Sequence, residues 1–491
     1  MLWYYSTNDK SIRVTFEEAI LKGQPDDFGL YMIPRRDIPK LSPSEIDEMP
    51  SMDYTDIAFK VLHSFLKEEI PKTTLKEILL DAYQEEKIPT EVEMVNENTH
   101  ILWLTKGPTY SFKDYAARFF GRALNYFLEK NNLRRTVIVA TSGDTGGAVA
   151  DALYNLDTID AIVFFPKGSI SEEQRRQMTT LQKNIYAFEV NGDFDVCQSL
   201  AKNLLGDKEF ARTVFQDPER LTSANSISLG RLLPQAIYPF FAYSRIINND
   251  SEQLLKPIIA SIPSGNFGDM MGTVIAKEMG LPILKIICGV NENKEFPEFL
   301  NSGKYEVHQS ISSPSSAMIV SHPSNLARLI DFYGGQMSDE RDNTTRKVVR
   351  PGMITVMPDM EAMRRDLFSV SVDNPQHYAT INDVYHKYGV LLDPHGAVGW
   401  QALKLFRDNN PSSMPAVIYE TADPGKFPED IVKAIGLRPK LPSGMKKQAT
   451  LEERVYSIKN GPENTSQGFR LSDAQIEEAK KKINIILHKE A

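Results

Sequence analysis

The segment GPTYSFKD, at residues 107–114, places a lysine between an aromatic residue and an aspartate. Lys113 follows Phe112 at the point where a loop shaped by glycine and proline leads into a predicted helix. Burial beside an apolar ring disfavours the ammonium form of a lysine and lowers its pKa, and an uncharged amine is needed to form a Schiff base with an aldehyde. The ordinary alternative is a surface lysine that reaches solvent and pairs with Asp114. The segment therefore predicts either a reactive amine or a solvated ion pair.

Three turns rich in small residues follow or flank predicted strands: TSGDTGG at 141–147, PSGNFGD at 263–269 and ETADPGKF at 420–427. None matches GxxxxGK[ST] or GxGxxG, which argues against ordinary ATP or dinucleotide binding. The second turn resembles a phosphate nest, because backbone N–H groups from Gly265 to Gly268 would converge at a helix N-terminus. Each turn alone is weak support for a site, since glycine there is often only backbone geometry. Together, an amine, a phosphate nest and a hydroxyl-bearing turn meet the needs of pyridoxal phosphate.

The composition limits the classes of function. With 491 residues and 41% hydrophobic content, the chain can form two to three domains of roughly 100 to 200 residues each. The formal net charge is −9, so nucleic acid is not an expected partner. Only Cys197 and Cys288 occur, both in apolar segments, which excludes a disulfide framework and fits a reducing compartment. No signal peptide or run of 18 apolar residues is present, so we expect a soluble, cytoplasmic protein without a membrane partner or metal site.

Strands alternate with helices from Thr136 onward, which predicts parallel sheets in two α/β domains with the cleft between them as the default site. Thr15 and Glu18 have the spacing of a capping box before a helix. The predicted division is a mostly helical N-terminal subdomain (1–95), a large α/β domain (96–135 and 255–440), a smaller α/β domain (136–254), and a C-terminal tail and helix (441–491). The Ser/Pro-rich segment 300–350 is interpreted as an insertion or a mobile substrate loop.

Motifs along nearly the whole chain resemble those of one enzyme family. They are TFEEAILKG with GLYMIP, GPTYSFKD, ATSGDTGGA, FPKGSIS, NGDFDVCQ, SANSISLGRLLPQ, SGNFGD, DPHGAVG and ETADPGKF. In this order they resemble the threonine synthases of the long form, which carry an extra N-terminal domain. That family belongs to the fold-type II pyridoxal-phosphate enzymes, which resemble the β subunit of tryptophan synthase. The resemblance implies two α/β domains with parallel or mixed sheets and an additional N-terminal subdomain.

The resemblance also implies a role for each residue that matches a family motif. Lys113 would form the Schiff base with pyridoxal 5'-phosphate, and Thr421 would face the pyridine nitrogen. The remaining roles are the cofactor phosphate for Gly265, Asn266, Phe267, Gly268 and Asp269, the substrate α-carboxylate for Ser142, Gly143, Asp144 and Thr145, and the substrate phosphate for Asn225, Ser226 and Arg231. An arginine suits a phosphate because its planar fork offers several donors. Asp144 could instead be a turn or N-cap aspartate, and Arg231 could instead form an ordinary ion pair on a helix.

The implied activity is that of a lyase in threonine biosynthesis. It would convert O-phospho-L-homoserine and water into L-threonine and phosphate by γ-elimination and β-addition of water. One alternative is a phospho-lyase or dehydratase that releases 2-oxobutyrate and ammonia. An alternative of another class is an inactive regulatory homologue that binds pyridoxal phosphate. We expect a monomer or a homodimer.

Three positions leave the family pattern or have no clear role in it. Lys106 precedes the glycine of GPT where many relatives have His or Asn, and it either adds charge for the substrate phosphate or points to solvent. Asp423 stands where the more familiar motif, TAHPAKF, has a histidine. His395, in DPHGAVG, is predicted to be a structural cap rather than a proton carrier.

Overall fold

The computed structural model describes residues 1–141, 143–247, 256–342, 348–465 and 468–489. They form two compact units, each described by itself. Unit 1 comprises Met1–Ala19, Gln24–Ala116 and Ser226–Lys440, and unit 2 comprises Ile20–Gly23, Ala117–Asn225 and Leu441–Ala491. This grouping differs from the division expected from the sequence, because most of segment 1–95 lies in unit 1 and segment 441–491 lies in unit 2. The separate subdomain and tail remain predictions.

Unit 1 is built on a mixed sheet of six strands in the order β14-β11-β10-β15-β5-β4. All neighbouring pairs are parallel except β5 with β4. The strands are β4 (Glu91–Asn96), β5 (Thr99–Trp103), β10 (Ile258–Pro263), β11 (Ile283–Val290), β14 (Leu367–Ser371) and β15 (Ala416–Glu420). The central strand β10 reads IIASIP and is buried throughout, as expected for a strand covered on both faces.

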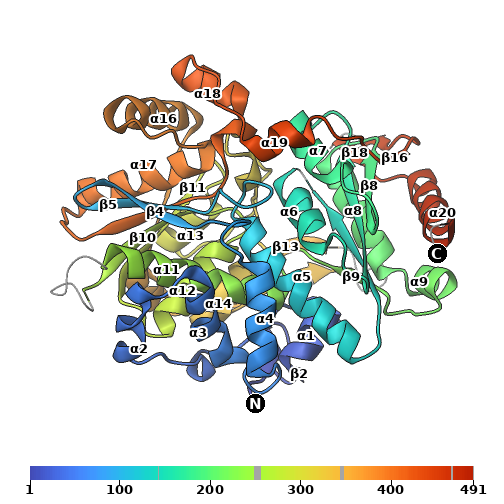
Figure 1. The fold of residues 1–491 in the computed structure, drawn as a ribbon, viewed down its shortest axis with the longest axis horizontal. Coiled ribbons are helices and arrows are strands. Elements are labelled where there is room, and N and C mark those ends of the chain that lie inside the picture. Colours follow the sequence, from blue (N-terminus) through green and yellow to red (C-terminus); the bar gives the residue numbers. More distant parts are fainter. Residues whose placement is uncertain (142, 248–255, 343–347, 466–467, 490–491) are drawn as a thin grey trace. The chain divides into compact units, whose positions relative to one another are not determined.

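Helices cover both faces of this sheet, as Figure 1 shows. One face carries α16 (Asn374–Tyr388) and α17 (Pro394–Asn409), and the other carries α11 (Ile237–Ile246) and α12 (Gly268–Glu278). Asp393 is the N-cap of α17: its carboxylate accepts from the N–H of Gly396, and Pro394 is the first residue of the helix. Its buried side chains pack with those of the central strands into one apolar cluster.

The N-terminal part of unit 1 is helical with a small sheet. The predicted capping box is confirmed, because Thr15 N–H donates to Glu18 Oε2 (2.8 Å) and Glu18 N–H donates to Thr15 Oγ1 (3.2 Å). The elements are β1 (Tyr4–Ser6), β2 (Arg13–Val14), α1 (Phe16–Lys22), β3 (Tyr31–Met32), α2 (Pro43–Asp47), α3 (Tyr54–Leu66) and α4 (Lys72–Ala82). The strands form the antiparallel sheet β2-β1-β3.

Unit 2 contains a parallel sheet of five strands in the order β16-β8-β7-β6-β9. The strands are β6 (Arg135–Ala140), β7 (Ile159–Pro166), β8 (Ile185–Val190), β9 (Leu221–Ser223) and β16 (Val455–Ile458). The helices α6 (Asp144–Leu153), α7 (Glu172–Thr179), α8 (Phe194–Gly206), α9 (Lys208–Phe215) and α20 (Asp473–Lys489) complete it. The predicted alternation of strands and helices is confirmed here.

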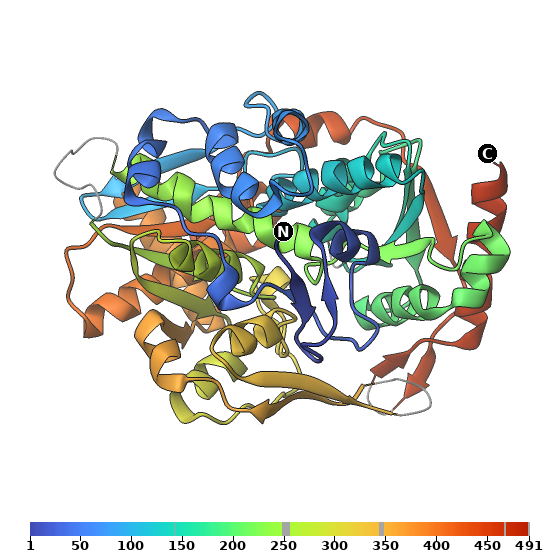
Figure 2. The same ribbon diagram turned by 90° about the horizontal axis from the view of Figure 1, so that it is seen from below.

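The remaining elements connect or flank these layers. Figure 2 shows β12 and β13 as a long antiparallel ribbon. The remaining elements are α5 (Lys113–Lys130), α10 (Leu229–Leu232), α13 (Glu295–Ser302), α14 (Leu326–Phe332), β12 (Gln336–Arg341), β13 (Val348–Val356), α15 (Met360–Asp366), α18 (Pro428–Ile435), α19 (Ser443–Gln448), β17 (Glu463–Thr465), β18 (Gly468–Arg470), and the 3-10 helices η1 (Arg35–Asp37), η2 (Met49–Ser51), η3 (Leu233–Ala236), η5 (Ser316–Met318) and η6 (Pro424–Lys426).

Three findings concern absent features and the cysteines. No helix among the described residues is long and apolar enough to cross a membrane. In the same ranges, no group of three or more His, Cys, Asp or Glu side chains is placed to hold a metal ion. Both cysteines, Cys197 and Cys288, are buried and free.

Candidate active site

Three neighbouring strands of unit 1 end at one edge and bring the predicted cofactor residues together. β10 leads into the turn at 264–267, β15 leads into Thr421, and β5 leads into the loop before Lys113. The N–H of Phe112 donates to the carbonyl of Thr421 (2.9 Å), and the N–H of Asp423 donates to the carbonyl of Tyr110 (3.0 Å). The lysine loop and the Thr421 turn are therefore joined by backbone bonds although they are distant in sequence.

Lys113 is the first residue of α5 and is half-buried. Its Nζ lies 4.7 Å from the centre of the Phe112 ring, so the expected contact between amine and aromatic side chain is present. The Asp114 carboxylate is buried and accepts from both the N–H and the hydroxyl of Thr109. Asp114 thus shapes the loop that presents the lysine, which the simple ion-pair interpretation did not include.

The turn after β10 has the backbone of an anion nest. Phe267 adopts a left-handed conformation (φ +61°) just before α12 begins. A Cβ atom at Gly265 would lie 2.8 Å from the carbonyl oxygen of Ala317, so that position has no room for a side chain. Burial raises the pKa of Asp269 to about 6, and the positive charge of Lys113 opposes this rise. The amine and the turn are therefore close enough to interact electrostatically.

Two of the predicted substrate-phosphate residues lie in unit 1. Arg231 is buried on the short helix α10. Burial lowers its pKa to about 10, and the nearby negative charge of Asp114 opposes this. The Ser226 hydroxyl lies 3.4 Å from that of Ser324. The third residue, Asn225, is in unit 2, where its N–H donates to Ser223 Oγ (3.3 Å).

The predicted carboxylate-binding turn lies in unit 2 at the start of α6. Thr141 Oγ1 accepts from the N–H groups of Gly143 and Gly146 (both 2.9 Å) and so holds the turn closed. Gly143 has φ +139°, a conformation that side chains disfavour. The buried carboxylate of Asp144 accepts from Nε2 of Gln174 (3.0 Å) and is not the helix cap. Thr145 is half-buried in the same turn, and Ser142 lies outside the described residues.

Comparison with known proteins identifies the family. The family model described as "Pyridoxal-phosphate dependent enzyme" matches residues 102–418, and those described as "Threonine synthase N terminus" and "Threonine synthase, C-terminal" match 3–83 and 396–467. The curated threonine synthases of Pseudomonas aeruginosa and Saccharomyces cerevisiae are 34% and 32% identical to the chain, with 93% of this chain and 96% and 95% of those proteins covered. The chain belongs to the threonine synthase family.

Solved structures of threonine synthases share the whole fold. The yeast enzyme matches with a TM-score of 0.86 at 29% identity, and the one from Brucella melitensis, described as PLP bound, matches with 0.84 at 28%. Each comparison covers 99% of both chains. The fold-type II class predicted from the sequence is therefore confirmed, as is membership of a family that depends on pyridoxal phosphate.

The residues of unit 1 fit this cofactor. Lys113 carries the half-buried primary amine that an aldehyde requires, and its charge acts on Asp269 in the turn. The turn has the bare backbone that a phosphate needs, because Gly265 leaves no space for a Cβ. Thr421, which is 5% exposed, carries a neutral hydroxyl, as expected of the residue predicted to face the pyridine nitrogen of the cofactor.

We expect Gly265→Ala to weaken binding of pyridoxal phosphate by about tenfold or more, because the added methyl group must displace Ala317 or the turn. Titration of the apo-protein followed by absorbance measures this affinity. Gly206→Ala at the end of α8 is the matched control, since no atom lies within 4 Å of a Cβ there. Equal affinities in the two variants would show that the turn is not the phosphate site.

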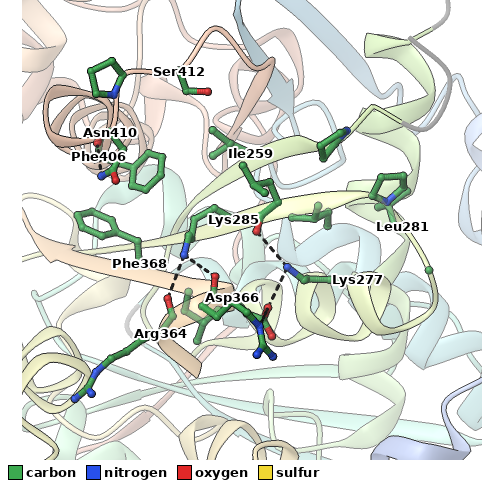
Figure 3. A pocket seen from close by; sticks show the side chains of 18 residues that line it. Ile259, Lys277, Leu281, Lys285, Arg364, Asp366, Phe368, Phe406, Asn410 and Ser412 are labelled. Atoms are coloured by element: carbon green, nitrogen blue, oxygen red, sulfur yellow. Dashed lines mark hydrogen bonds and ion pairs between the residues drawn. The ribbon is translucent and has the colours of Figure 1, made fainter. Parts of the chain in front are cut away.

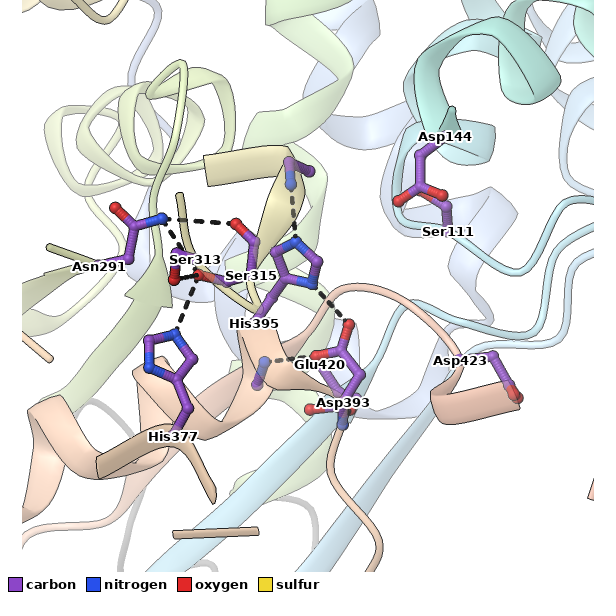
Figure 4. Close-up of polar contacts among 12 residues, drawn as sticks. Ser111, Asp144, Asn291, Ser313, Ser315, His377, Asp393, His395, Glu420 and Asp423 are labelled. Carbon is purple, nitrogen blue, oxygen red and sulfur yellow. Dashed lines mark hydrogen bonds and ion pairs between the residues drawn. The ribbon is translucent and has the colours of Figure 1, made fainter. Parts of the chain in front are cut away.

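His395 holds the segment at 313–318, whose Ala317 carbonyl lies next to Gly265, and Figure 4 shows the polar contacts of this histidine. Its Nδ1 lies 2.9 Å from Asp393 Oδ2, and its Nε2 accepts from the N–H of Ala317 (3.1 Å). Since an amide N–H only donates, the proton of this imidazole is on Nδ1. His377 acts on the same segment, with Nε2 3.0 Å from Ser315 Oγ, and burial lowers its pKa. The two hydrogen bonds of the buried His395 ring, to Asp393 and to the Ala317 N–H, support a structural rather than a proton-carrying role.

We expect His395→Asn to destabilise the protein by about 1 kcal/mol, because the asparagine amide can still reach Asp393 but leaves the Ala317 N–H without its acceptor. His395→Gln can keep that acceptor and should lose less. Urea unfolding measures the free energy, and hydrogen exchange of the amides in 313–318 measures the local effect. Faster exchange in the glutamine variant than in the asparagine variant would contradict this assignment.

The two departures from the family pattern have local partners. Lys106 Nζ lies 2.9 Å from Glu91 Oε2 at an exposed position, which favours the solvent-facing alternative. Asp423 caps η6 by accepting from the N–H of Gly425 (2.8 Å). Burial raises the pKa of Asp423, and the charges of Lys426 and Lys106 oppose the rise.

A cavity of about 940 Å³ lies at the opposite edge of the unit 1 sheet. Its lining includes Ile259, Ile283 and Leu367, at or next to the first residues of β10, β11 and β14. Figure 3 shows Lys285 bonded to the carbonyl of Arg364, and Lys277 facing Asp366. Ligands of parallel α/β sheets bind at the carboxyl ends of strands, so this cavity is separate from the site above.

Sequence reasoning missed several side chains that hold the site. Gln174 had the spacing of a capping box after Ser171, but this signal places a helix and not its contact with Asp144. Asn325 and Arg328 lie in HPSNLARL, inside the segment interpreted as an insertion or mobile loop. In the structure that stretch begins α14 and reaches the turn at Asn266.

Proposed function

We propose that the protein converts O-phospho-L-homoserine and water into L-threonine and phosphate, as a threonine synthase. The observation that carries the proposal is the meeting of the lysine loop, the phosphate turn and Thr421 at the carboxyl ends of β5, β10 and β15. Relatives named threonine synthase align over almost the whole chain, which supports the same overall reaction.

The proposed cofactor contacts are Lys113 for the aldehyde, 265–269 for the phosphate and Thr421 for the ring nitrogen. When bound, pyridoxal phosphate supplies an electron sink for negative charge that develops on the substrate carbons. Thr421 would meet the ring nitrogen with a neutral hydroxyl, which does not stabilise a positive charge there as a carboxylate would. This choice limits how far the negative charge spreads into the ring.

The proposed substrate contacts are hydrogen-bond donors that face the two anionic groups of the substrate. Arg231, Asn225 and Ser226 would bind the substrate phosphate, because a guanidinium fork and neutral polar groups satisfy several phosphate oxygens. The turn that includes Gly143, Asp144 and Thr145, with Ser142, would bind the α-carboxylate through N–H and hydroxyl groups.

Lys113 is the proposed carrier of protons. Once the substrate has displaced it, its amine would take the proton from Cα and then one from Cβ. The C–O bond at Cγ breaks with its electron pair leaving on phosphate, and Cγ then receives a proton. Water adds its oxygen to Cβ and a proton returns to Cα, which balances one substrate and one water against threonine and phosphate. Arg231 stabilises the phosphate as negative charge builds on it.

The test is incubation of the cofactor-loaded protein with O-phospho-L-homoserine. Threonine and phosphate formed in equal amounts are the expected result. Formation of 2-oxobutyrate and ammonia would replace this proposal with the phospho-lyase alternative, and no turnover with bound cofactor would favour a regulatory homologue. The cytoplasmic location and the monomeric or homodimeric state expected from the sequence remain proposals.

A further inference from the structure

Arg328, in the first turn of α14, is a fully buried arginine whose hydrogen bonds all go to neutral acceptors. Its Nε donates to the carbonyl of Tyr31 (3.0 Å) and its Nη2 to that of Ile227 (2.6 Å). Its Nη1 donates to Asn325 Oδ1 (2.6 Å) and, at 3.4 Å, to the carbonyl of Ser226. The guanidinium is therefore fixed in direction by four groups, none of which carries a negative charge.

No carboxylate within the ranges that the structure describes forms an ion pair with Arg328. Two other buried arginines do have a carboxylate partner: Arg118 lies 3.3 Å from Asp151, and Arg135 lies 3.4 Å from Asp217. Burial alone lowers the pKa of Arg328 to about 9. A buried cation without a counter-charge is strongly unfavourable, so such a group is retained where an anion is available to compensate it.

The contacts of Arg328 lead directly to both proposed phosphate sites. Asn325, which Arg328 holds, donates through its N–H (3.2 Å) and its Nδ2 (2.9 Å) to the carbonyl of Asn266 in the phosphate turn. The carbonyl of Ser226, which Arg328 also reaches, belongs to the segment proposed to bind the substrate phosphate. The buried charge therefore contacts the 226–227 segment directly and reaches the Asn266 turn through one residue, Asn325.

We propose that Arg328 is a positioning residue for phosphate binding, which joins the 226–227 segment to the Asn266 turn and whose uncompensated charge is balanced by a bound phosphate monoester. The inference rests on the proposed function, because it takes the two segments as phosphate sites. The phosphate belongs to the cofactor or to the substrate, and binding measurements separate the two sources.

The decisive variant is Asn325→Asp, which places a carboxylate beside the Arg328 guanidinium and keeps the arginine. The buried pair then neutralises the charge, and we expect affinity for a phosphate ligand to fall by about tenfold. Asn325→Ala is the matched control, since it removes the same amide donor without adding charge, and it should lose less. Arg328→Lys should retain more affinity than Arg328→Gln, because lysine keeps the charge.

Two binding assays distinguish the phosphates. Titration of each apo-protein with pyridoxal phosphate reports on the cofactor phosphate, and titration of the cofactor-loaded protein with inorganic phosphate reports on the substrate phosphate. Unphosphorylated pyridoxal is the control ligand. If Arg328 had only a structural role, the variants would lose affinity for pyridoxal and for pyridoxal phosphate to the same extent. We expect the affinity for pyridoxal to stay within about twofold of the wild type in Asn325→Asp, while at least one phosphate ligand binds about tenfold more weakly.

Equal phosphate affinities in wild type, Asn325→Asp and Asn325→Ala would overturn the proposal. So would a parallel loss of pyridoxal and pyridoxal phosphate binding, which would indicate general distortion of the site. If Arg328→Gln does not fold, judged by circular dichroism, Asn325→Asp and Asn325→Ala decide the question. A wild-type protein that binds pyridoxal phosphate and inorganic phosphate but makes no threonine would contradict the proposed function. The affinities of Asn325→Asp and Asn325→Ala for these two ligands would then still decide the role of Arg328.

Discussion

Lys113→Ala is expected to lower the rate of threonine formation by at least about 10³-fold, which is the scale of a lost general acid and base. The reason is that one amine is proposed both to hold the cofactor aldehyde and to move the protons of Cα and Cβ. The bond between the Phe112 N–H and the Thr421 carbonyl fixes the backbone directly before Lys113. Coupled measurement of threonine and phosphate gives the rate.

Lys130→Ala is the control for this substitution. Lys130 is an exposed lysine at the other end of the same helix, α5, and its loss should leave the rate unchanged. The absorbance band of the lysine-bound cofactor should vanish in Lys113→Ala and persist in Lys130→Ala. Turnover of Lys113→Ala above background, with cofactor bound, would show that another group carries the protons.

Arg231→Gln is expected to reduce kcat/KM for O-phospho-L-homoserine by about 10²-fold, the value of one or two charge-assisted hydrogen bonds to phosphate. Arg231 is buried, so burial strengthens its interaction with a bound anion relative to one at an exposed position. Because the phosphate gains charge as it leaves, we expect kcat to fall as well as KM to rise. Steady-state kinetics and inhibition by inorganic phosphate measure both effects.

Arg36→Gln removes the same charge from an exposed position of unit 1, where Arg36 Nε lies 3.7 Å from Asp37, and serves as the control. Arg231→Lys should recover only part of the loss, because an ammonium lacks the planar fork. An unchanged inhibition constant for phosphate in Arg231→Gln would assign Arg231 to the ordinary structural role considered for it from the sequence.

Helices and strands could be predicted from the sequence where residues close in the chain determine them. The capping box of Thr15 and Glu18 and the alternation of strands and helices from Thr136 both appear in the structure, because side-chain spacing and caps act within a few residues. The segment 300–350 was interpreted as an insertion or a mobile substrate loop because its Ser and Pro content is typical of loops. Its described part contains η5, α14 and β12, and the residues between Gly303 and Ser315 form no helix or strand. Its order depends on side chains far away in sequence, such as His377 and His395.

The sequence by itself determined the family and the cofactor and pointed to Lys113 as the proposed reactive lysine, because these depend on short motifs whose residues are neighbours in the chain. Tertiary structure alone decided which motifs meet. The order β10-β15-β5 brings the turn at Gly265, Thr421 and the Lys113 loop to one edge, and no local pattern encodes that order. It also decided that Arg328 is buried without a carboxylate partner among the described residues, since burial and charge balance are properties of packed neighbours and not of the residue itself.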